Sequence, residues 1–203
     1  MTYELVVWHE PEGGAPVSRA RAVAAYEGAA PHPSAAAFAD DFAGRFPGVP
    51  VEGEGDRFVR ITMEPERADE VSAQVYGLAR AYGLTCYDPE RDLVHNLGPT
   101  GAYEGMQLHT GDGLQVADPD LQLVQDALER LSFQNPFAAL VVFGAHFVQA
   151  APEPGGGYEL EYKDSRQGKI FRTHVAGLDE VKRAFDEYAR DDRAFLARHD
   201  WEG

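Results

Sequence analysis

The spacing of apolar residues in the first half of the chain changes several times between a strand-like and a helix-like period. Residues 3–8 (YELVVW) and 84–87 (LTCY) form short apolar runs, and 57–63 (RFVRITM) alternates as a half-buried strand does. Between them, apolar residues recur three or four positions apart, which indicates helices. We predict strands at 3–8, 57–63, 84–87 and 93–97 and helices at 17–27, 34–46 and 66–82, in the order βααβαββ.

Two of these helices carry recognisable signals at their ends. Ser34 is expected to cap the second helix, in which Phe38, Phe42 and Phe46 recur four residues apart on one face. Gly83 follows the third helix as a C′ glycine, the residue type that tolerates the left-handed backbone needed there. The third helix shows the same one-sided pattern, with apolar residues at positions 71, 75, 78 and 82.

The second half begins a new series of elements after residues 98–105 (GPTGAYEG), a Gly- and Pro-rich stretch that we take as the domain boundary. Asp118 and Pro119 are expected to cap and start a helix that runs to Leu131. Strands and turns then alternate up to a final helix. We predict strands at 106–110, 138–143, 146–151, 158–164 and 169–175 and helices at 119–131 and 178–191, in the order βαββββα.

The last two predicted strands form a hairpin whose register follows from its turn. If 165–168 is a four-residue loop, Tyr162 lies opposite Phe171 and Leu160 lies opposite Thr173. This pairing gathers apolar residues on one face, because alternate residues of a strand point to opposite faces. The other face is polar and carries two opposed pairs, Glu161 with Arg172 and Glu159 with His174.

Together these elements predict an α+β fold of two small domains, 1–98 and 105–203. Each domain is expected to be an antiparallel sheet with helices packed on one of its faces. No internal repeat relates the halves, and a hydrophobic fraction of 44% is enough to form a core. We therefore expect a folded chain rather than a disordered one.

The chain is strongly acidic, with 34 acidic and 18 basic residues and a formal net charge of −16. The acidic surplus is shared evenly between the two halves. Direct binding to DNA or RNA is disfavoured, because affinity there comes largely from Lys and Arg that neutralise phosphates. Two interpretations stay open: a solvated acidic surface that serves solubility, and a surface that docks a basic protein partner.

Cys86 is the only cysteine, so no internal disulfide is possible, which favours a reducing cytoplasm. The N-terminal MTYELVVWHE has neither a basic region nor a long apolar run, so we expect no signal peptide. No stretch approaches about 20 consecutive apolar residues, so no transmembrane helix and no membrane partner are expected. No pattern indicates an oligomeric state.

The sequence shows no catalytic or metal-binding motif. None of the seven histidines has a second His or Cys three or four residues away, and 109–120 (HTGDGLQVADPD) lacks the ligand spacing of an EF-hand. None of the five serines lies in a G-x-S-x-G elbow. We therefore expect no metal, no cofactor and no enzymatic activity. The alternative is a small enzyme whose site gathers residues distant in sequence: His109, Asp112, His146 and Glu161.

The polar face of the last hairpin is the candidate partner-binding surface. As an exposed cross-strand pair, Glu161 and Arg172 would contribute well under about 1 kcal/mol, so a solvated face is the simpler interpretation. As part of an interface, the same face would be acidic, with one adjustable charge at His174. The predicted partner-binding residues are Glu159, Glu161, Asp164, Arg172, His174 and Trp201.

Segments 3–8 (YELVVW) and 78–89 (LARAYGLTCYDP) carry a resemblance in the first half. It resembles a family of small bacterial proteins that open with YDL-V-W and carry LA--hGLv-YDP before the last strand. Glu4 replaces the usual Asp, and Tyr82 replaces the usual His. Most matched positions are core and turn residues of a sheet.

In the second half, FVQA at 147–150, GYELEY at 157–162 and LDEV at 178–181 are followed by Phe185, Tyr188 and Trp201. With these residues the second half resembles the Imm1-type immunity proteins of actinobacterial polymorphic toxin systems. The resemblance implies a protein that binds and neutralises a cognate toxin, and it brings no enzymatic site. An acidic inhibitor would suit a basic toxin that acts on nucleic acid. A regulatory scaffold without a single partner is the other non-enzymatic alternative.

Overall fold

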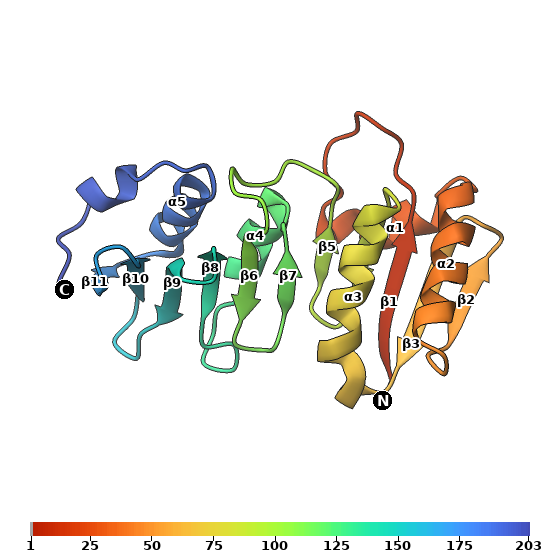
Figure 1. Ribbon diagram of the computed structural model, residues 1–203, viewed down its shortest axis with the longest axis horizontal. Helices are drawn as coiled ribbons and strands as arrows, with labels where there is room; N and C mark the ends of the chain where they lie inside the picture. Colours follow the sequence, from red (N-terminus) through yellow and green to blue (C-terminus); the bar gives the residue numbers. More distant parts are fainter. Residues whose placement is uncertain (1) are drawn as a thin grey trace. The chain divides into compact units, whose positions relative to one another are not determined.

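The computed structural model describes residues 2–203 and shows two compact units, Met1–Gly98 and Pro99–Gly203 (Figure 1). Each unit contains one antiparallel sheet, of five strands in the first unit and six in the second, with helices packed on it. The predicted α+β class is therefore confirmed. Each unit also has its own core of buried apolar side chains.

The N-terminal unit is built on a sheet of strand order β2-β3-β1-β4-β5. β1 lies at the centre and pairs antiparallel on both sides, with Leu5 opposite Ile61 of β3 and Val7 opposite Cys86 of β4. In chain order the elements are β1 (Tyr3–Trp8), α1 (Ala22–Glu27), α2 (Pro33–Arg45), β2 (Val51–Glu54), β3 (Phe58–Met63), α3 (Ala68–Ala81), β4 (Thr85–Asp88) and β5 (Leu93–His95).

Both faces of β1 are buried, which explains the apolar run that predicts this strand. Leu5 and Val7 are fully buried on the face that α3 covers. Val6 and Trp8 point the other way and pack in a cluster with Ala22 of α1. The expectation of helices on one sheet face is wrong for this unit, because α1 buries the second face.

The C-terminal unit is built on a sheet of strand order β11-β10-β9-β8-β6-β7. Its two helices pack against each other, and the second of them contacts the three strands at one end of the sheet. In chain order the elements are β6 (Gln107–Thr110), β7 (Gln115–Ala117), α4 (Leu121–Leu128), β8 (Ala138–Val142), β9 (His146–Pro152), β10 (Tyr158–Asp164), β11 (Lys169–Val175) and α5 (Leu178–Ala189).

The apolar core of this unit lies on one face of its sheet. Leu108, Leu140 and Val148 are fully buried and lie opposite one another on β6, β8 and β9. Tyr162 of β10 continues the row and meets the ring of Tyr188 on α5, with centroids 6.4 Å apart. We call this side of the sheet the helix-covered face.

The sequence pattern misses two short strands, β2 and β7. Both lie at sheet edges. β2 reads VEGE and is mostly exposed, and β7 reads QVA, so neither alternates over enough residues to be recognised. With these strands the observed orders are βααββαββ and ββαββββα instead of βααβαββ and βαββββα.

The start of α2 differs from the prediction. His32 caps this helix instead of Ser34: the Nδ1 atom of His32 accepts a hydrogen bond from the backbone N–H of Ser34 at 3.2 Å. Pro33 takes the first helical position, where its missing N–H costs nothing. Histidine is outside the usual set of capping residues, and the ring of His32 is held by stacking on His9, with centroids 3.6 Å apart.

The bounds of α4 are also narrower than predicted. Asp120 caps the helix, and its carboxylate accepts a hydrogen bond from the backbone N–H of Leu123 at 2.9 Å. Asp118 instead takes a left-handed backbone with φ of 49° in the preceding turn. The helix ends at Leu128, one turn before the predicted end at residue 131.

The Gly- and Pro-rich stretch after Gly98 packs into the C-terminal unit. The carbonyl of Pro99 accepts a hydrogen bond from Leu121 at 2.9 Å, and the N–H of Ala102 donates to the carbonyl of Ala189 at 2.7 Å. A Cβ on Gly101 would lie 2.7 Å from that same carbonyl oxygen, so only glycine permits this close approach. Residues 99–102 thus join the ends of α4 and α5.

The register of the last hairpin is confirmed. Tyr162 lies opposite Phe171, and Glu161 lies opposite Arg172. The chain then returns after α5, and Glu202 forms an isolated bridge with Arg172, with reciprocal N–H···O bonds of 2.8 Å. The C-terminal residues therefore lie along the outer edge of β11.

A buried polar cluster lies between α3 and the sheet of the N-terminal unit. Asp88 is fully buried and accepts hydrogen bonds from the hydroxyls of Tyr3 and Tyr76 and from the backbone N–H of Arg91. His95 stacks on the ring of Tyr76, with centroids 3.6 Å apart. Neither ring nitrogen of His95 has a hydrogen-bond partner among the described residues, and burial lowers its pKa to about 3.

This buried imidazole is expected to make folding sensitive to acid. The unfolded chain protonates His95 near pH 6.5, and the folded chain protonates it only near pH 3. The free energy of unfolding therefore falls by roughly 1.4 kcal/mol for each unit by which the pH is lowered between these two values. We expect His95→Leu to reduce the loss of unfolding free energy between pH 7 and pH 4 by about 3 kcal/mol. Urea titrations at both pH values measure this loss, with His109→Leu as a control at a surface position. An unchanged pH dependence in His95→Leu would contradict the prediction.

Candidate functional site

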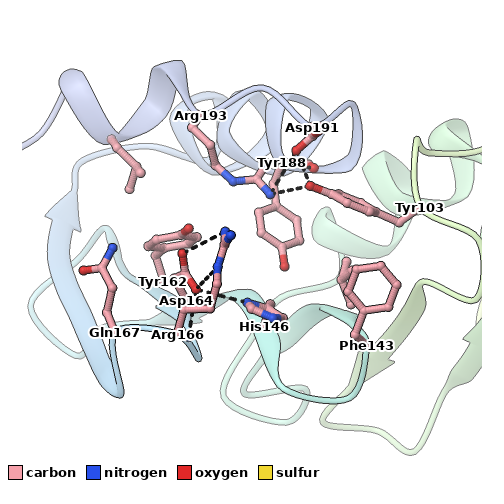
Figure 2. Close-up of a pocket in the computed structure, with 12 residues that line it drawn as sticks. Tyr103, Phe143, His146, Tyr162, Asp164, Arg166, Gln167, Tyr188, Asp191 and Arg193 are labelled. Atoms are coloured by element: carbon pink, nitrogen blue, oxygen red, sulfur yellow. Dashed lines mark hydrogen bonds and ion pairs between the residues drawn. The ribbon is translucent and has the colours of Figure 1, made fainter.

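The C-terminal unit holds a cavity of about 530 Å³ between α5 and the strands below it (Figure 2). Four aromatic side chains line it: Tyr103, Phe143, Tyr162 and Tyr188. Five titratable polar side chains line it as well: His146, Asp164, Arg166, Asp191 and Arg193. A mixture of apolar walls and a few polar groups is typical of binding sites.

The strand pleat and the end of α5 position these side chains. Tyr162 and Asp164 are two residues apart on β10, so both project toward α5. Tyr188 lies on the last turn of α5, and the chain then turns at Asp191, whose φ is 61°. This turn returns Arg193 over the Tyr188 ring, with the guanidinium carbon 4.5 Å from the ring centroid.

The two cationic side chains of the cavity have different partners. Arg166 is 84% exposed and binds Asp164 through its Nε and Nη2 atoms at 3.2 and 3.3 Å. These bonds, with one from the backbone N–H of Arg166, lower the pKa of Asp164. Arg193 donates instead to the hydroxyl of Tyr103 at 2.7 Å, and the carboxylate of Asp191 is 3.4 Å away.

Ser165, His146 and Asp164 meet beside the cavity with a spacing that resembles a Ser-His-Asp triad. Ser165 Oγ lies 3.0 Å from His146 Nε2, and His146 Nδ1 lies 3.4 Å from Asp164 Oδ1. The backbone N–H of Ser165, however, also donates to Nδ1, at 3.3 Å. When Nδ1 accepts this bond it carries no proton, and the proton of a neutral ring is then on Nε2, which donates to Ser165 Oγ. A serine hydroxyl in this arrangement is not activated as a nucleophile.

Tyr188 is the most enclosed polar group of the cavity. Its side chain is fully buried, and its hydroxyl has no hydrogen-bond partner among the described residues. In Figure 2 the ring extends from α5 into the space between Arg166 and Phe143. Burial raises the pKa of Tyr188 above its usual value, so the phenol stays neutral and keeps its O–H as a donor.

Phe143 stands at the rim of the cavity in an unfavourable backbone conformation. It lies in the turn between β8 and β9 with φ of 52°, next to Gly144 with φ of 66°. Such turns favour Asn or Gly, and a left-handed backbone costs other residues roughly 1–2 kcal/mol. The ring is nonetheless 74% exposed and makes an edge contact with Tyr103, with centroids 5.8 Å apart.

The other face of the same sheet carries no helix among the described residues, and we call it the open face. The strand register arranges its side chains in rows that run across the strands. One row is largely apolar in its middle and consists of Ile170, Lys163, Phe147, Val141 and Gln107.

The neighbouring row of the open face is polar. Glu161 stands in it between Arg172 and Gln149, and Gln149 donates to its carboxylate at 3.0 Å. Arg172 binds the other carboxylate oxygen, so Glu161 is almost buried between its neighbours. Glu159 and His174 form the next pair along the hairpin. Lys163 and Arg172 offset Glu159 and Glu161, and Glu153, which contacts His174, adds one negative charge, so this face carries little net charge.

The predicted partner-binding residues therefore divide between two surfaces. Four of them, Glu159, Glu161, Arg172 and His174, lie together on the open face. Asp164 lines the cavity on the helix-covered face. Trp201 is half-buried on that same side, where its ring contacts Tyr162 and its Nε1 donates to the carbonyl of Leu196 at 3.1 Å.

The four residues of the enzyme alternative are not brought together either. His109 and Glu161 lie on the open face, but β8 and β9 separate their strands. Asp112 lies in the turn after β6, where Arg130 holds its carboxylate at 2.7 Å. His146 lines the cavity on the opposite face.

Sequence reasoning misses most of the cavity. Tyr103 comes from the stretch taken as a linker, Phe143 from a predicted strand end, and Arg193 from beyond the last helix. Tyr188 is recognised only as a core residue of its helix. The one available signal is Phe143 before Gly144, because an aromatic residue is unusual in such a turn.

Searches against protein-family models, curated proteins and solved structures find no match for this chain. Across residues 2–203, three or more His, Cys, Asp or Glu side chains are nowhere grouped so as to hold a metal ion. None of the helices in that range has the length and apolar character to span a membrane.

The hydrogen bonding around His146 predicts that Ser165 is not a reactive serine. We expect a fluorophosphonate probe to leave the protein unlabelled, because His146 donates to Ser165 Oγ instead of accepting its proton. Mass spectrometry of the treated protein measures this, with Ser165→Ala as the control. Labelling that is lost in both Ser165→Ala and His146→Ala would contradict the assignment and favour an esterase-like activity.

Proposed function

We propose that this protein is a cytoplasmic immunity protein that binds a cognate, basic toxin domain and neutralises it by covering its active site. The open face of the six-stranded sheet carries the proposal: it is the one surface that gathers four of the predicted partner-binding residues. The resemblance of the second half to immunity proteins of polymorphic toxin systems supports the same function.

The open face has the composition expected of a protein interface. Phe147 and Val141 lie side by side and supply an apolar strip, with Ile170 beyond Lys163, and interfaces derive most of their affinity from a few such anchors at their centre. Glu161, Arg172 and Gln149 already bind one another before a partner arrives. Docking then orders few additional side chains, which lowers the entropic cost of association.

The charge of the protein has a separate role in this proposal. Because the open face is close to neutral, the net charge of −16 acts through the field of the whole molecule. Such a field raises the rate of encounter with a basic partner more than it strengthens the complex. Contacts on the open face then determine how long the complex lasts.

A rescue experiment tests the proposal directly. The protein encoded next to this chain in its genome is expressed in a heterologous host, alone and with this protein. We expect growth arrest that this protein relieves and that an unrelated acidic immunity protein does not. The proposal would be wrong if the neighbouring protein were not toxic, or if it were toxic and this protein did not relieve the toxicity. Rescue by any acidic protein would show that binding is not specific to this chain.

Phe147 provides the sharpest test of the open face. We expect Phe147→Asp to weaken toxin binding by at least about 100-fold, because it places a charge in the apolar strip. Phe133→Asp changes the charge equally at an exposed phenylalanine in the loop before β8 and should alter affinity less than about threefold. Calorimetric titration measures both affinities, and circular dichroism verifies folding. Equal losses in the two variants would argue against the open face.

Ionic strength should affect association and dissociation differently. Between about 0.05 and 0.5 M salt, we expect the association rate constant to fall at least tenfold, because screening weakens the attraction between oppositely charged proteins. The dissociation rate constant should change by less than about threefold. Surface plasmon resonance gives both constants. An association rate constant that does not change with salt concentration would contradict the role proposed for the net charge of −16.

A further inference from the structure

We infer that the cavity of the C-terminal unit is a second binding site, which accepts a carboxylate carried on an aromatic or apolar body. The site lies on the helix-covered face, across the sheet from the surface proposed for the toxin. It therefore does not depend on the proposed function, and either proposal can fail alone.

The cavity has more hydrogen-bond donors than acceptors available to a ligand. The O–H of the fully buried Tyr188 has no partner among the described residues. Arg193 directs its hydrogen bonds at neutral oxygens, namely the hydroxyl of Tyr103 at 2.7 Å and the carbonyls of Tyr188 and Asp192 at 3.4 and 3.1 Å. The nearest carboxylate, that of Asp191, lies 3.4 Å from Arg193 and is itself 62% exposed to water, so the guanidinium and the unpartnered phenol O–H can both turn to an anionic acceptor.

The carboxylates of the cavity, by contrast, already have donors. Asp164 accepts from the side chain of Arg166 and from its backbone N–H at 2.9 Å. Asp191 accepts a hydrogen bond from the hydroxyl of Tyr103, and its side chain is 62% exposed to water. A cationic ligand would have to displace Arg166 or Arg193 from these contacts, whereas an oxyanion can use the O–H of Tyr188, which has no partner among the described residues.

The apolar walls of the cavity indicate which body the carboxylate of the ligand is attached to. Tyr103, Tyr162 and Tyr188 present rings, and Val142 and Leu196 complete an apolar lining. A volume of about 530 Å³ lies within the range of small-ligand pockets and exceeds the need of a lone inorganic ion. The fitting ligand is therefore an aromatic carboxylate, as a free small acid or as the C-terminus of a peptide.

The conformation of Phe143 is a second, independent observation that favours ligand binding at the cavity. A strained backbone at an exposed aromatic residue lowers stability without any benefit to the core. At the rim of the cavity the same ring can cover an aromatic ligand once it is seated.

A matched pair of ligands tests the charge requirement. The full chain labelled with ¹⁵N is titrated with N-acetylphenylalanine and with N-acetylphenylalaninamide, which lacks only the carboxylate charge. We expect the acid to shift the amide signals of residues 142–146, 164–167 and 188–193 and to bind at least about tenfold more tightly than the amide. Binding of the amide as tight as that of the acid, or no shift with either, would overturn the proposal.

The Tyr188 hydroxyl gives a matched pair of protein variants. Tyr188→Phe should weaken binding of the acid about 5- to 10-fold, because one hydrogen bond to the carboxylate is lost. Its melting temperature should not fall, since the removed hydroxyl is unpaired in the free protein. Tyr158→Phe, on the same strand as Tyr162 but outside the cavity, is the control and should bind normally. Unchanged affinity in Tyr188→Phe would overturn the assignment of the hydroxyl.

A third titration separates the two sources of the carboxylate. A hexapeptide that ends in phenylalanine with a free C-terminus is compared with N-acetylphenylalanine. Tighter binding of the peptide assigns the cavity to a protein terminus, and weaker binding assigns it to a small acid. Binding by neither would overturn the proposal, while rescue from the toxin and the Phe147→Asp result would stand unaffected.

Discussion

The alternation of side chains along β10 is the constraint on which both surfaces of the C-terminal unit depend. Leu160, Tyr162 and Asp164 point toward α5, and the residues between them, such as Glu161, point away. A shift of one residue in the hairpin would exchange the two sets and bury the glutamates. The same seven residues therefore supply part of a cavity wall on one side and part of the open face on the other, and the register with β9 and β11 keeps these roles apart.

Much of the fold follows from local patterns, and its exceptions have local causes. The runs at 3–8 and 138–143 and the hairpin register are predicted because buried strands leave strong periodic signals. β2 and β7 leave none, since a short edge strand contacts the core with few side chains. His32 could not be foreseen as a cap, because its position depends on a stacked His9 from a distant segment.

The site is less accessible to sequence reasoning than the fold. The four open-face residues are neighbours on one hairpin, so their grouping needs only the strand period and one turn. The cavity instead is lined by Tyr103, His146 and Arg193, which are distant in the sequence. They meet only because the segment before β6 and the segment after α5 both pack beside the sheet. The distribution of charge over the surface could not be predicted from the net charge either. The chain is acidic, yet its open face carries little net charge, because Lys163 and Arg172 lie beside the glutamates.

The bridge between Arg172 and Glu202 has a consequence for how this protein can meet others. An uncovered edge strand is a template for strands of another chain, and the C-terminal residues close part of that edge at β11. At the opposite edge of the same sheet, β7 has only three residues. At one edge of the five-stranded sheet, β2 carries two exposed glutamates, which repel a second copy of themselves. Growth of the six-stranded sheet into a larger intermolecular sheet is thereby discouraged, and association of this unit is directed to its faces, where side chains can select the partner.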